Sequence, residues 1–475
     1  MNQRGRIGGA LCLLLCVWLS ACRSEPRPDL GAIYNEPAQR IGAQRNPVIV
    51  IPGILGSKLE EPGLKTPVWG AFTYGAADPD TVAGARLVAL PMEKGKPLSE
   101  LRDTVVPTTV LDTLELDVAL VVRGLEIAAY DEIIRTLAAG AYRDETLALA
   151  GAVDYGGLHF TCFQYAYDWR RDIAEQAAAL HQRVLAAQQA AQDGHGLDQP
   201  PRVDVVAHSM GGLVLRYYLR YGPQPLPDDG SLPELNWAGA RNVETAIIIG
   251  TPSAGSVLSL KQLVEGVNYV GLITPTYRPA VLGSMPSIYQ LLPRVRHARV
   301  IDEATGELVD FLDPKVWKQY GWGLADPDDA RTRRWLLPDA EDDAERAEIA
   351  YEHLEKCLAR ADQLFRALDA PATDMPAGVT TRIVLYAGDA HDTADVLSVN
   401  PETGKLTIQS TAPGDGTVTR HSALMDERVG GPHKPRLRSP VRWDAVQFIP
   451  ADHIGLTSDP AFSDNVLYEL LERPR

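Results

Sequence analysis

The stretch from Val203 to Leu219 constrains the fold more than any other part of the sequence. It begins with a β-branched apolar run up to Val206, typical of a buried parallel strand, and its apolar residues recur with roughly helical spacing after Met210. A turn of small residues between the two halves carries Ser209 in the pattern small-x-Ser-x-Gly. Such a turn lifts the serine above the sheet, where a base can reach it. We therefore predict that Ser209 is a nucleophile; a chance serine on an ordinary turn is the alternative.

The surroundings of this serine offer two backbone donors for an oxyanion. The helix that follows Ser209 aims its first N–H groups toward the turn, which makes Met210 one candidate. The second candidate lies in the loop after the apolar strand at residues 48–51, where Pro52-Gly53 lets the backbone approach a substrate closely. We predict that the N–H groups of Ile54 and Met210 form an oxyanion hole. A strand followed by an ordinary turn is the alternative for the first loop.

Strands and helices alternate along the chain, which is typical of a mostly parallel sheet with helices on both faces. The apolar runs predict strands at residues 48–51, 158–165, 203–206, 243–249, 382–386 and 445–449. Helical periodicity predicts helices at 126–140, 172–192, 342–368 and 464–471. We therefore expect an α/β architecture.

Two long stretches interrupt this alternation. Residues 60–125 are rich in Pro and Gly, and we interpret them as a lid-like excursion. Residues 254–375 separate two core strands by more than an ordinary connection, and we interpret them as a cap insertion. The cap carries large apolar residues that either pack on one another as a satellite core or line a groove for an acyl chain: Leu291, Leu292, Trp317 and Trp322.

A nucleophilic serine of this kind needs a histidine base, which should follow the acid in the chain and lie at the carboxyl end of a strand. Of the ten histidines, only His421, His433 and His453 follow a plausible acid after the cap. His453 comes soon after the strand predicted at 445–449. His433 lies among Gly, Pro, Lys and Arg residues, a composition that is typical of a solvent-exposed loop. We predict that His453 is the base.

The acid of the triad should be a carboxylate on a turn between the cap and this histidine. Asp415 lies on a glycine-flanked turn, Gly414-Asp415-Gly416, that can place a carboxylate under an imidazole. Asp389 and Asp392, just after the strand that ends at Tyr386, are the competitors. We favour Asp415; a solvated turn aspartate is the alternative for all three.

The first residues of the sequence predict export. Residues 1–21 combine a basic start with an apolar run too short to span a membrane, as a secretion signal does. The signal ends in Leu-Ser-Ala before Cys22, so we expect lipidation of Cys22 and an anchor in a bacterial cell envelope, on an outer-membrane or periplasmic face. Cleavage near Ala21 and release as a secreted protein is the alternative. Residues 22–45, rich in Pro and charge, are interpreted as a tether.

The composition fits one globular exported domain at residues 46–475. The net charge of −16 argues against binding to nucleic acid or to anionic membrane surfaces by charge. Neither a Cys/His cluster with metal-ligand spacing nor a phosphate-binding glycine loop occurs, so we expect no metal and no cofactor. Outside the signal only Cys162 and Cys357 remain; they form one disulfide or stay as two buried thiols.

The motifs taken together resemble the lecithin:cholesterol acyltransferase family, with its lysosomal phospholipase and phospholipid:diacylglycerol acyltransferase relatives. They occur in family order within residues 46–471, as Pro52–Leu59, Tyr167–Arg170, Ala207–Gly212, Gly250–Pro252, Gly414–Val418 and Asp452-His453. The resemblance implies an α/β-hydrolase fold with a lid over an apolar acyl site. The cysteines that staple the lid of the animal enzymes have no counterpart among residues 60–125.

This resemblance also implies roles for the predicted residues: Ser209 as nucleophile, Asp415 as acid, His453 as base, and Ile54 and Met210 as oxyanion donors. We expect a serine acyltransferase or lipase that acts on lipid esters through an acyl-enzyme, without a cofactor. A general carboxylesterase, an amidase or peptidase on the same residues, and an inactive surface lipoprotein are the alternatives.

Overall fold

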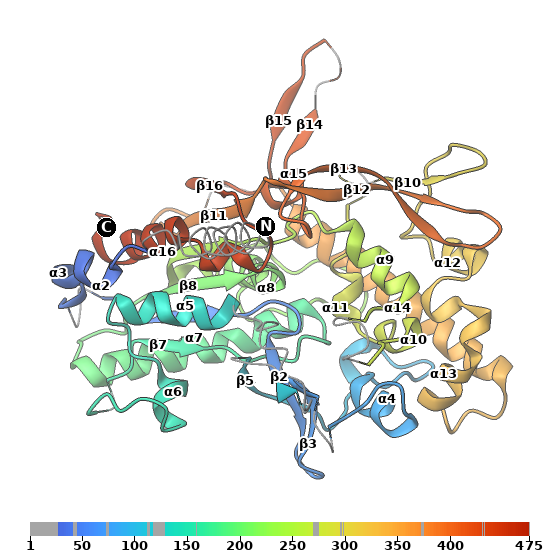
Figure 1. Ribbon diagram of the computed structural model, residues 1–475, viewed down its shortest axis with the longest axis horizontal. Coiled ribbons are helices and arrows are strands. Elements are labelled where there is room, and N and C mark those ends of the chain that lie inside the picture. The colour runs from blue at the N-terminus through green and yellow to red at the C-terminus, as the bar shows by residue number, and fades with distance from the viewer. Residues whose placement is uncertain are drawn as a thin grey trace, which may run out of the picture.

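The computed structural model describes residues 27–474, apart from 41–44, 73–75, 112–114, 117–128, 158, 269–274, 295–296, 298, 372–374, 430 and 432 (Figure 1). The predicted signal at residues 1–21 and the predicted lipidation site Cys22 lie outside these residues. Parts of the predicted tether, lid-like excursion and cap also fall outside them.

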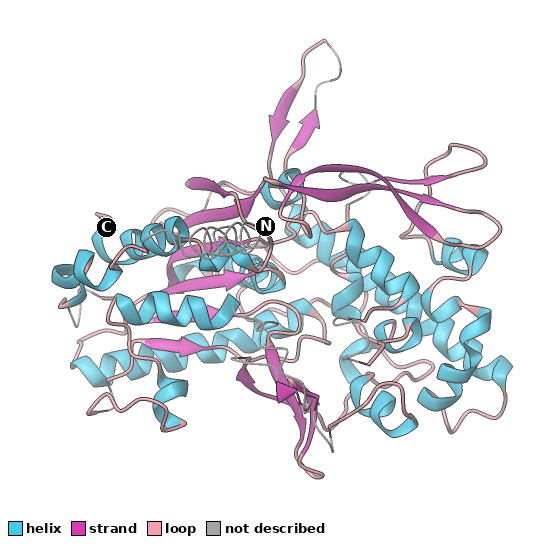
Figure 2. Ribbon diagram, viewed as in Figure 1, coloured by secondary structure: helices cyan, strands magenta, loops and turns pink. Residues whose placement is uncertain are grey.

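A parallel six-stranded sheet forms the centre of the domain (Figures 1 and 2). Its strands lie in the order β16 (Ala445–Ile449), β11 (Arg382–Gly388), β9 (Val243–Ile249), β8 (Val203–His208), β1 (Val48–Ile51) and β7 (Cys162–Gln164). Every neighbouring pair is parallel. All residues of β1 and β8 are buried. β1 is a continuous apolar run, whereas β8 also buries Asp204 and His208. All strands therefore end at the same edge of the sheet.

Helices cover both faces of this sheet, and successive strand residues alternate between the two cores. One core joins Val48, Val50 and Val206 to apolar residues of α5 (Ala129–Ala139) and α16 (Pro460–Leu467). The other joins Ile49, Ile51 and Val205 to α7 (Ile173–His195) and α8 (Met210–Tyr221). This two-sided burial confirms the predicted α/β architecture.

The predicted cap lies between β9 and β11. Its elements are α9 (Val257–Glu265), α10 (Pro279–Leu282), α11 (Pro286–Tyr289), β10 (Arg299–Asp302), α12 (Pro314–Tyr320), α13 (Ala330–Leu336) and α14 (Asp343–Asp369). The four large apolar residues singled out in the sequence are buried in the main core: Leu291, Leu292, Trp317 and Trp322. These four side chains therefore pack as core and do not line an open groove.

The lid-like excursion builds a small antiparallel sheet in the order β3 (Thr66–Trp69), β2 (Ser57–Glu61) and β5 (Val106–Val110). The helix α4 (Val82–Val88) and the short parallel pair β4 (Ala71–Phe72) and β6 (Glu115–Leu116) belong to the same stretch.

A second set of strands follows β11. β12 (His391–Val399) and β13 (Leu406–Gly414) form a hairpin that pairs with β10 of the cap. After α15 (Arg420–Leu424), the pair β14 (Glu427–Val429) and β15 (Arg436–Arg438) stands out from the body of the molecule in Figure 1. The remaining helical segments are α6 (Glu145–Leu149), Leu98–Glu100, Ala240–Asn242, Gly323–Ala325, Pro327–Asp329, Gly455–Ser458 and the π-helical turn Tyr468–Glu472.

Part of the segment predicted as a tether is folded. Residues 30–38 form the short helices α2 (Leu30–Ile33) and α3 (Asn35–Ala38). Between them Tyr34 is buried, and its hydroxyl lies 2.8 Å from both the carbonyl and a carboxylate oxygen of Asp464 in α16. The packed domain therefore begins before residue 46, because a buried aromatic ring ties this segment to the last helix.

Cys162 and Cys357 are both buried free thiols. They therefore do not form a disulfide, which was one of the two possibilities that the sequence allowed.

Among the helices that the structure describes, none has the length and apolar character needed to cross a membrane.

Candidate active site

Ser209 lies at the turn between β8 and α8, as predicted. Its φ of 53° and ψ of −125° are rare for a residue with a side chain, and such strain persists only where the surroundings fix it. Here the Ser209 N–H donates to the Ile249 carbonyl at 2.8 Å, and the Thr251 hydroxyl donates to the Ser209 carbonyl at 2.8 Å. The end of β9 thus holds the serine in position from both sides.

The two glycines after the serine let the turn pack tightly. A Cβ added to Gly211 would lie 2.4 Å from the Pro52 carbonyl oxygen, and one added to Gly212 would lie 1.9 Å from the Thr251 hydroxyl oxygen. Both distances are shorter than atoms tolerate, so a larger residue at either position would push the helix away from the loops. This explains the small residues in the pattern around Ser209.

The structure brings together three residues that the sequence predicted. The Ser209 Oγ lies 3.0 Å from the His453 Nε2, and the His453 Nδ1 lies 2.8 Å from the Asp415 Oδ2. His453 follows β16 of the central sheet, and Asp415 follows β13 of the neighbouring three-stranded sheet. Asp415 reaches the same edge of the central sheet, because a Cβ added to Gly388 at the end of β11 would lie 2.7 Å from the Asp415 Cβ. Asp415 is 2 % exposed and Ser209 is 8 % exposed, which keeps the line of hydrogen bonds away from most solvent.

The Asp415 carboxylate is kept ionised although it is buried. Burial alone would raise its pKa, but the charge and hydrogen bond of His453 and the N–H groups of Val418 and Thr417 outweigh burial, so the pKa lies below its ordinary value. The Val418 and Thr417 N–H groups reach the Asp415 Oδ1 at 2.7 and 2.9 Å. The His453 N–H also donates to the Asp415 carbonyl at 2.8 Å, which couples the two loops.

The competing residues lie elsewhere. Asp389 is 3.6 Å from the Arg420 guanidinium in a largely exposed pair. Asp392 and His433 are exposed, and His421 lies 3.2 Å from Asp395. None of these contacts involves Ser209 or His453, so the geometry singles out Asp415 and His453 among the candidates that the sequence offered.

The loop after β1 lies against the serine. A Cβ added to Gly53 would lie 2.7 Å from the Ser209 Cβ and 3.3 Å from its Oγ, so the backbone of this loop can approach Ser209 only with glycine at this position. Within the described part of the chain, the N–H of the next residue, Ile54, has no protein acceptor. Met210 is the first residue of α8, where an N–H has no carbonyl one turn earlier to bind. Among the described residues, neither predicted donor has a protein acceptor; Ile54 follows the glycine that contacts Ser209, and Met210 follows Ser209 itself.

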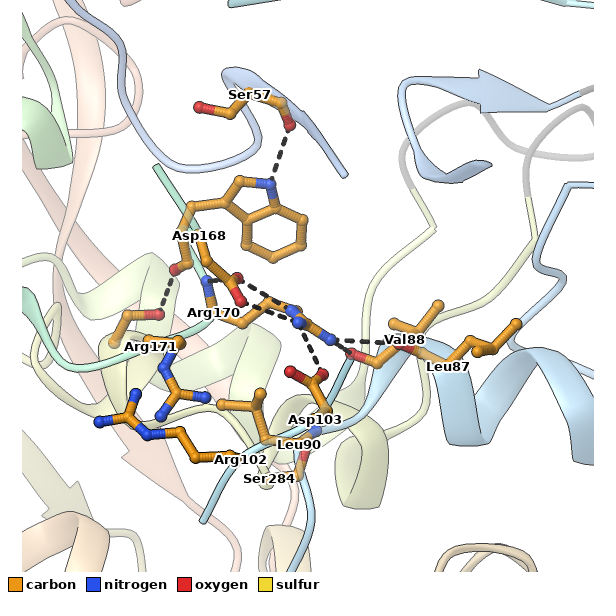
Figure 3. A network of polar contacts seen from close by, with 12 residues as sticks. Ser57, Leu87, Val88, Leu90, Arg102, Asp103, Asp168, Arg170, Arg171 and Ser284 are labelled. Carbon is orange, nitrogen blue, oxygen red and sulfur yellow. Dashed lines mark hydrogen bonds and ion pairs between the residues drawn. The ribbon is translucent and has the colours of Figure 1, made fainter. Parts of the chain in front are cut away.

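A buried arginine beside this loop was not assigned a role from the sequence. The Arg170 guanidinium donates to both carboxylate oxygens of Asp168, at 2.9 and 2.8 Å, and to Asp103 at 2.8 Å (Figure 3). It also donates to the carbonyls of Leu87 and Val88, each at 3.1 Å, in the lid-like excursion. Burial alone would lower the pKa of Arg170, and the two carboxylates reverse that effect and raise it.

The neighbouring aromatic residue ties the same segment to the loop after β1. The Trp169 indole N–H donates to the Ser57 carbonyl at 3.2 Å, and the Trp169 carbonyl accepts from Ser287 of α11 at 2.6 Å (Figure 3). The motif Tyr167–Arg170 therefore joins the strand-end loop, the lid-like excursion and the cap. The signal in the sequence was an arginine flanked by aromatic and acidic residues just after a strand.

His208 is a second residue whose place the sequence did not predict. It precedes Ser209 in the chain, and its Nε2 lies 3.1 Å from the His453 carbonyl oxygen. The two imidazole rings are 5.0 Å apart between centroids. Burial, followed by the charge of His453, lowers the pKa of His208 to about 3, so its ring is neutral near pH 7.

A cavity of about 840 Å³ lies elsewhere in the fold. Its lining includes Glu244 and Arg382, at the amino ends of β9 and β11, with Arg216 and Arg220 of α8 and the Trp237 ring. These strand ends are opposite to the edge where Ser209 and His453 meet, so this cavity is not part of the site. Both arginines are already engaged, because they donate to the carbonyls of Leu368 and Ala370 at the end of α14.

Comparison with solved structures supports the fold. The crystal structure of the Tle4–Tli4 complex matches 90 % of this chain and 98 % of that chain, with 14 % identity and a TM-score of 0.56. The propeptide form of the Bacillus licheniformis lipase BlEst2 matches 93 % and 53 %, with 11 % identity and a TM-score of 0.36. The Legionella pneumophila phospholipase PlaB matches 74 % and 58 %, with 13 % identity and a TM-score of 0.32. At such low identity the first match supports a shared fold and nothing more, and the TM-scores of the other two are too low to support any conclusion.

Comparison with protein families supports the resemblance inferred from the motifs. The model of the lecithin:cholesterol acyltransferase family matches residues 157–334, which include Tyr167–Arg170, Ser209 and Thr251 but not Ile54, Asp415 or His453. No curated protein matches the sequence. The match supports an esterase-type enzyme of the lipid hydrolase and acyltransferase kind. The chain is therefore an α/β-hydrolase whose residues 157–334 carry the sequence pattern of the lecithin:cholesterol acyltransferase family.

Proposed function

We propose that this protein is a serine hydrolase or acyltransferase that cleaves lipid esters through an acyl-enzyme. The observation that carries the proposal is the hydrogen-bonded line from Ser209 through His453 to Asp415, with distances of 3.0 and 2.8 Å. Such a line is what a hydroxyl nucleophile needs, because the base must lie within hydrogen-bond reach and be oriented by a third group.

In the first step the Ser209 Oγ attacks the ester carbonyl carbon while the His453 Nε2 takes its proton. Asp415 holds the His453 Nδ1–H and stabilises the imidazolium, and the N–H groups of Ile54 and Met210 stabilise the oxyanion. The tetrahedral intermediate then breaks the bond to the leaving alcohol, which takes the proton from His453. The product of this step is an ester of Ser209 with the acyl group.

The second step decides between hydrolysis and transfer. Water or a lipid hydroxyl gives its proton to His453 and attacks the acyl carbon. The bond to the Ser209 Oγ then breaks, His453 returns the proton to this oxygen, and an acid or a new ester is released. Incubation with a phospholipid plus a sterol or diacylglycerol acceptor, followed by product analysis, separates the two outcomes. A new acyl ester of the acceptor identifies a transferase, and a free fatty acid alone identifies a lipase.

The nucleophile is tested with a fluorophosphonate probe, which labels an activated serine. We expect the wild type to be labelled and Ser209→Ala to lose both labelling and about 10⁴-fold or more of its ester hydrolysis. Ser253→Ala is the matched control, because Ser253 is also buried and follows the neighbouring strand β9. Equal labelling of the Ser209→Ala variant would contradict the assignment, and an unlabelled folded wild type would favour the inactive lipoprotein. Cleavage of amides in preference to esters would favour the peptidase alternative.

We also propose that the protein is held at a membrane of the bacterial cell envelope by a lipid on Cys22. The support is the sequence alone, with its apolar run followed by Leu-Ser-Ala-Cys at residues 19–22. Cys22→Ser should move the protein from the membrane fraction to the soluble fraction without changing its rate on soluble short-chain esters. Two or more acyl chains give stable anchoring, so a variant that stays in the membrane fraction would argue for another attachment.

A further inference from the structure

The peptide bond between Pro52 and Gly53, one residue before Ile54, is held at both of its polar ends by tyrosine hydroxyls. The Gly53 N–H donates to the Tyr130 hydroxyl at 2.7 Å, and the Tyr167 hydroxyl donates to the Pro52 carbonyl at 2.9 Å. Tyr130 lies on α5 and Tyr167 on the loop after β7, and their side chains are 3 % and 1 % exposed. Solvent therefore cannot replace either hydroxyl, and the orientation of this peptide depends on the two side chains.

The Ile54 N–H belongs to the next peptide, Gly53–Ile54, so its position depends on how both peptides are held. The Gly53 carbonyl accepts from the Gly56 N–H at 3.1 Å, so the following peptide is also restrained. Gly53 lies in contact with Ser209, so a rotation of the Pro52–Gly53 peptide would shift the loop against the nucleophile. Donors that stabilise an oxyanion act best when they need no reorganisation during the reaction.

The Tyr130 hydroxyl also connects this loop to the base. It donates to the His208 Nδ1 at 3.3 Å, and the His208 Nε2–H donates to the His453 carbonyl at 3.1 Å. The neutral ring offers one acceptor and one donor, which suits this arrangement. Three hydrogen bonds in one direction thus run from the Gly53 N–H to the backbone of the residue that carries the base.

We propose that Tyr130 and Tyr167 hold the oxyanion loop in its active orientation, and that His208 couples this loop to the segment that carries His453. These are positioning residues, since they act through the Gly53 N–H, the Pro52 carbonyl and the His453 backbone. The inference rests on the proposed function, because it assigns them a part in the reaction at Ser209.

Tyr130→Phe keeps the ring and removes both hydrogen bonds. We expect kcat to fall about 10- to 100-fold while KM stays within about threefold, since a misplaced oxyanion donor weakens the transition state more than the bound substrate. Tyr167→Phe should act in the same sense. Tyr165→Phe is the matched control and should stay within about twofold of the wild type, because Tyr165 stacks on Tyr167 at 5.7 Å but donates to the Gln176 carbonyl of α7.

Affinity for a trifluoromethyl ketone separates this role from a purely structural one. The ketone forms an oxyanion with Ser209, so its Ki should rise in Tyr130→Phe by the same factor by which kcat/KM falls, whereas the melting temperature should match that of Tyr165→Phe. His208→Gln, whose amide nitrogen reaches the position of the Nε2, should retain more kcat than His208→Ala. If Tyr130→Phe melts far below Tyr165→Phe, its activity cannot be interpreted. The comparison of His208→Gln with His208→Ala and the kcat of Tyr167→Phe then test the proposal.

Several outcomes would overturn the inference. One is a Tyr130→Phe variant that turns over substrate as fast as Tyr165→Phe. A second is a fall in kcat with no change in the Ki of the ketone, and a third is equal activity of His208→Gln and His208→Ala. Each of these leaves the proposed function standing if the fluorophosphonate still labels Ser209 in the wild type. A folded wild type that takes no label removes the proposed function and this inference together.

Discussion

At the scale of single residues, Asp415 shows how this fold keeps a charge buried and directed. Its carboxylate accepts two backbone N–H groups on one oxygen and the His453 imidazole on the other. The two backbone bonds fix the plane of the carboxylate, so the free oxygen can lie only where His453 meets it. The glycine-flanked turn in the sequence predicted this residue, because such a turn exposes backbone N–H groups.

The choice of Asp415 over Asp389 leads to a testable difference. Asp415→Asn should lower kcat roughly 10³- to 10⁴-fold, because an amide in place of the carboxylate favours the wrong tautomer of His453 and stabilises the imidazolium poorly. Asp389→Asn should change kcat by less than about twofold, since the carboxylate of Asp389 forms a largely exposed ion pair with Arg420. The measurement is kcat for a soluble ester in both variants. If Asp389→Asn were the crippling change, the acid would lie on the other turn.

At the scale of elements, the bounds of strands with many apolar residues were predicted best. The strands at Val48–Ile51, Val243–Ile249 and Ala445–Ile449 have the predicted bounds. The apolar signal is uninterrupted in Val48–Ile51, whose residues are all buried. Residue 158 of the strand expected at 158–165 lies outside the described residues; of the others, 162–164 pair with β1, which is itself only four residues long. The last helix begins earlier than expected, at Pro460, where Asp459 caps it through the Ala461 N–H.

The parts that the sequence did not predict depend on partners far away in the chain. Tyr34 lies in the segment predicted as a tether, and its hydrogen-bond partner, Asp464 of α16, is far away in the chain. The partner of His208 is likewise distant, because it is the His453 carbonyl. The four apolar residues of the cap were ambiguous in the same way, since burial and substrate binding select the same residue types.

Arg170 offers a prediction about how the lid-like excursion is held. Arg170→Ala should lower the free energy of unfolding by about 3–5 kcal/mol, because it leaves the buried carboxylate of Asp168 and the half-buried carboxylate of Asp103 without their partner. Arg334→Ala is the control and should lower the free energy of unfolding far less, since its pair with Asp343 is half exposed. Urea unfolding of the two variants measures the difference. Equal losses would show that Arg170 is not the residue that fixes this segment.

At the scale of the whole molecule, the topology of the sheet assembles the site. Ser209, Asp415 and His453 follow β8, β13 and β16, and the cap separates the serine from the other two along the chain. The parallel order β16-β11-β9-β8 brings the loops after β8 and β16 to one edge, and Asp415, which follows β13 of the neighbouring three-stranded sheet, lies against Gly388 at the end of β11. The alternation of strands and helices predicted this edge, the positions after strands predicted Ser209 and His453, and the glycine-flanked turn predicted Asp415.

Two buried histidines predict how stability depends on pH. Burial lowers the pKa of His208 to about 3 and that of His353 in α14 to about 4, from 6.5. Between about pH 4 and 6.5 the unfolded chain binds more protons than the folded chain, so the free energy of unfolding falls as the pH falls through this window. Each histidine contributes up to about 1.4 kcal/mol per pH unit to this loss. Urea unfolding between pH 4.5 and 7.5 should therefore show stability rising with pH.

A variant separates the contribution of one histidine. His353→Gln keeps a donor for the Ser284 carbonyl, which His353 reaches at 3.0 Å, but it cannot take up the proton. It should flatten the dependence of stability on pH, whereas His433→Gln, at an exposed position, should leave the slope as it is. A slope that His353→Gln does not change would mean that other groups cause the loss in acid.

The length of the acyl group of the substrate provides a further test of the proposed function. Ile54 and Leu55 are half-buried in the loop against Ser209, and Ile454, next to His453, is 40 % exposed, so apolar side chains flank the site. A lipid-ester enzyme should use such a surface, and each methylene buried in the transition state contributes up to about 0.8 kcal/mol, or roughly fourfold in kcat/KM. Across p-nitrophenyl esters from acetate to dodecanoate, kcat/KM should rise and then level off. Ile454→Ala should weaken the rise and spare acetate. Equal turnover of short and long esters by the wild type would instead identify a general carboxylesterase.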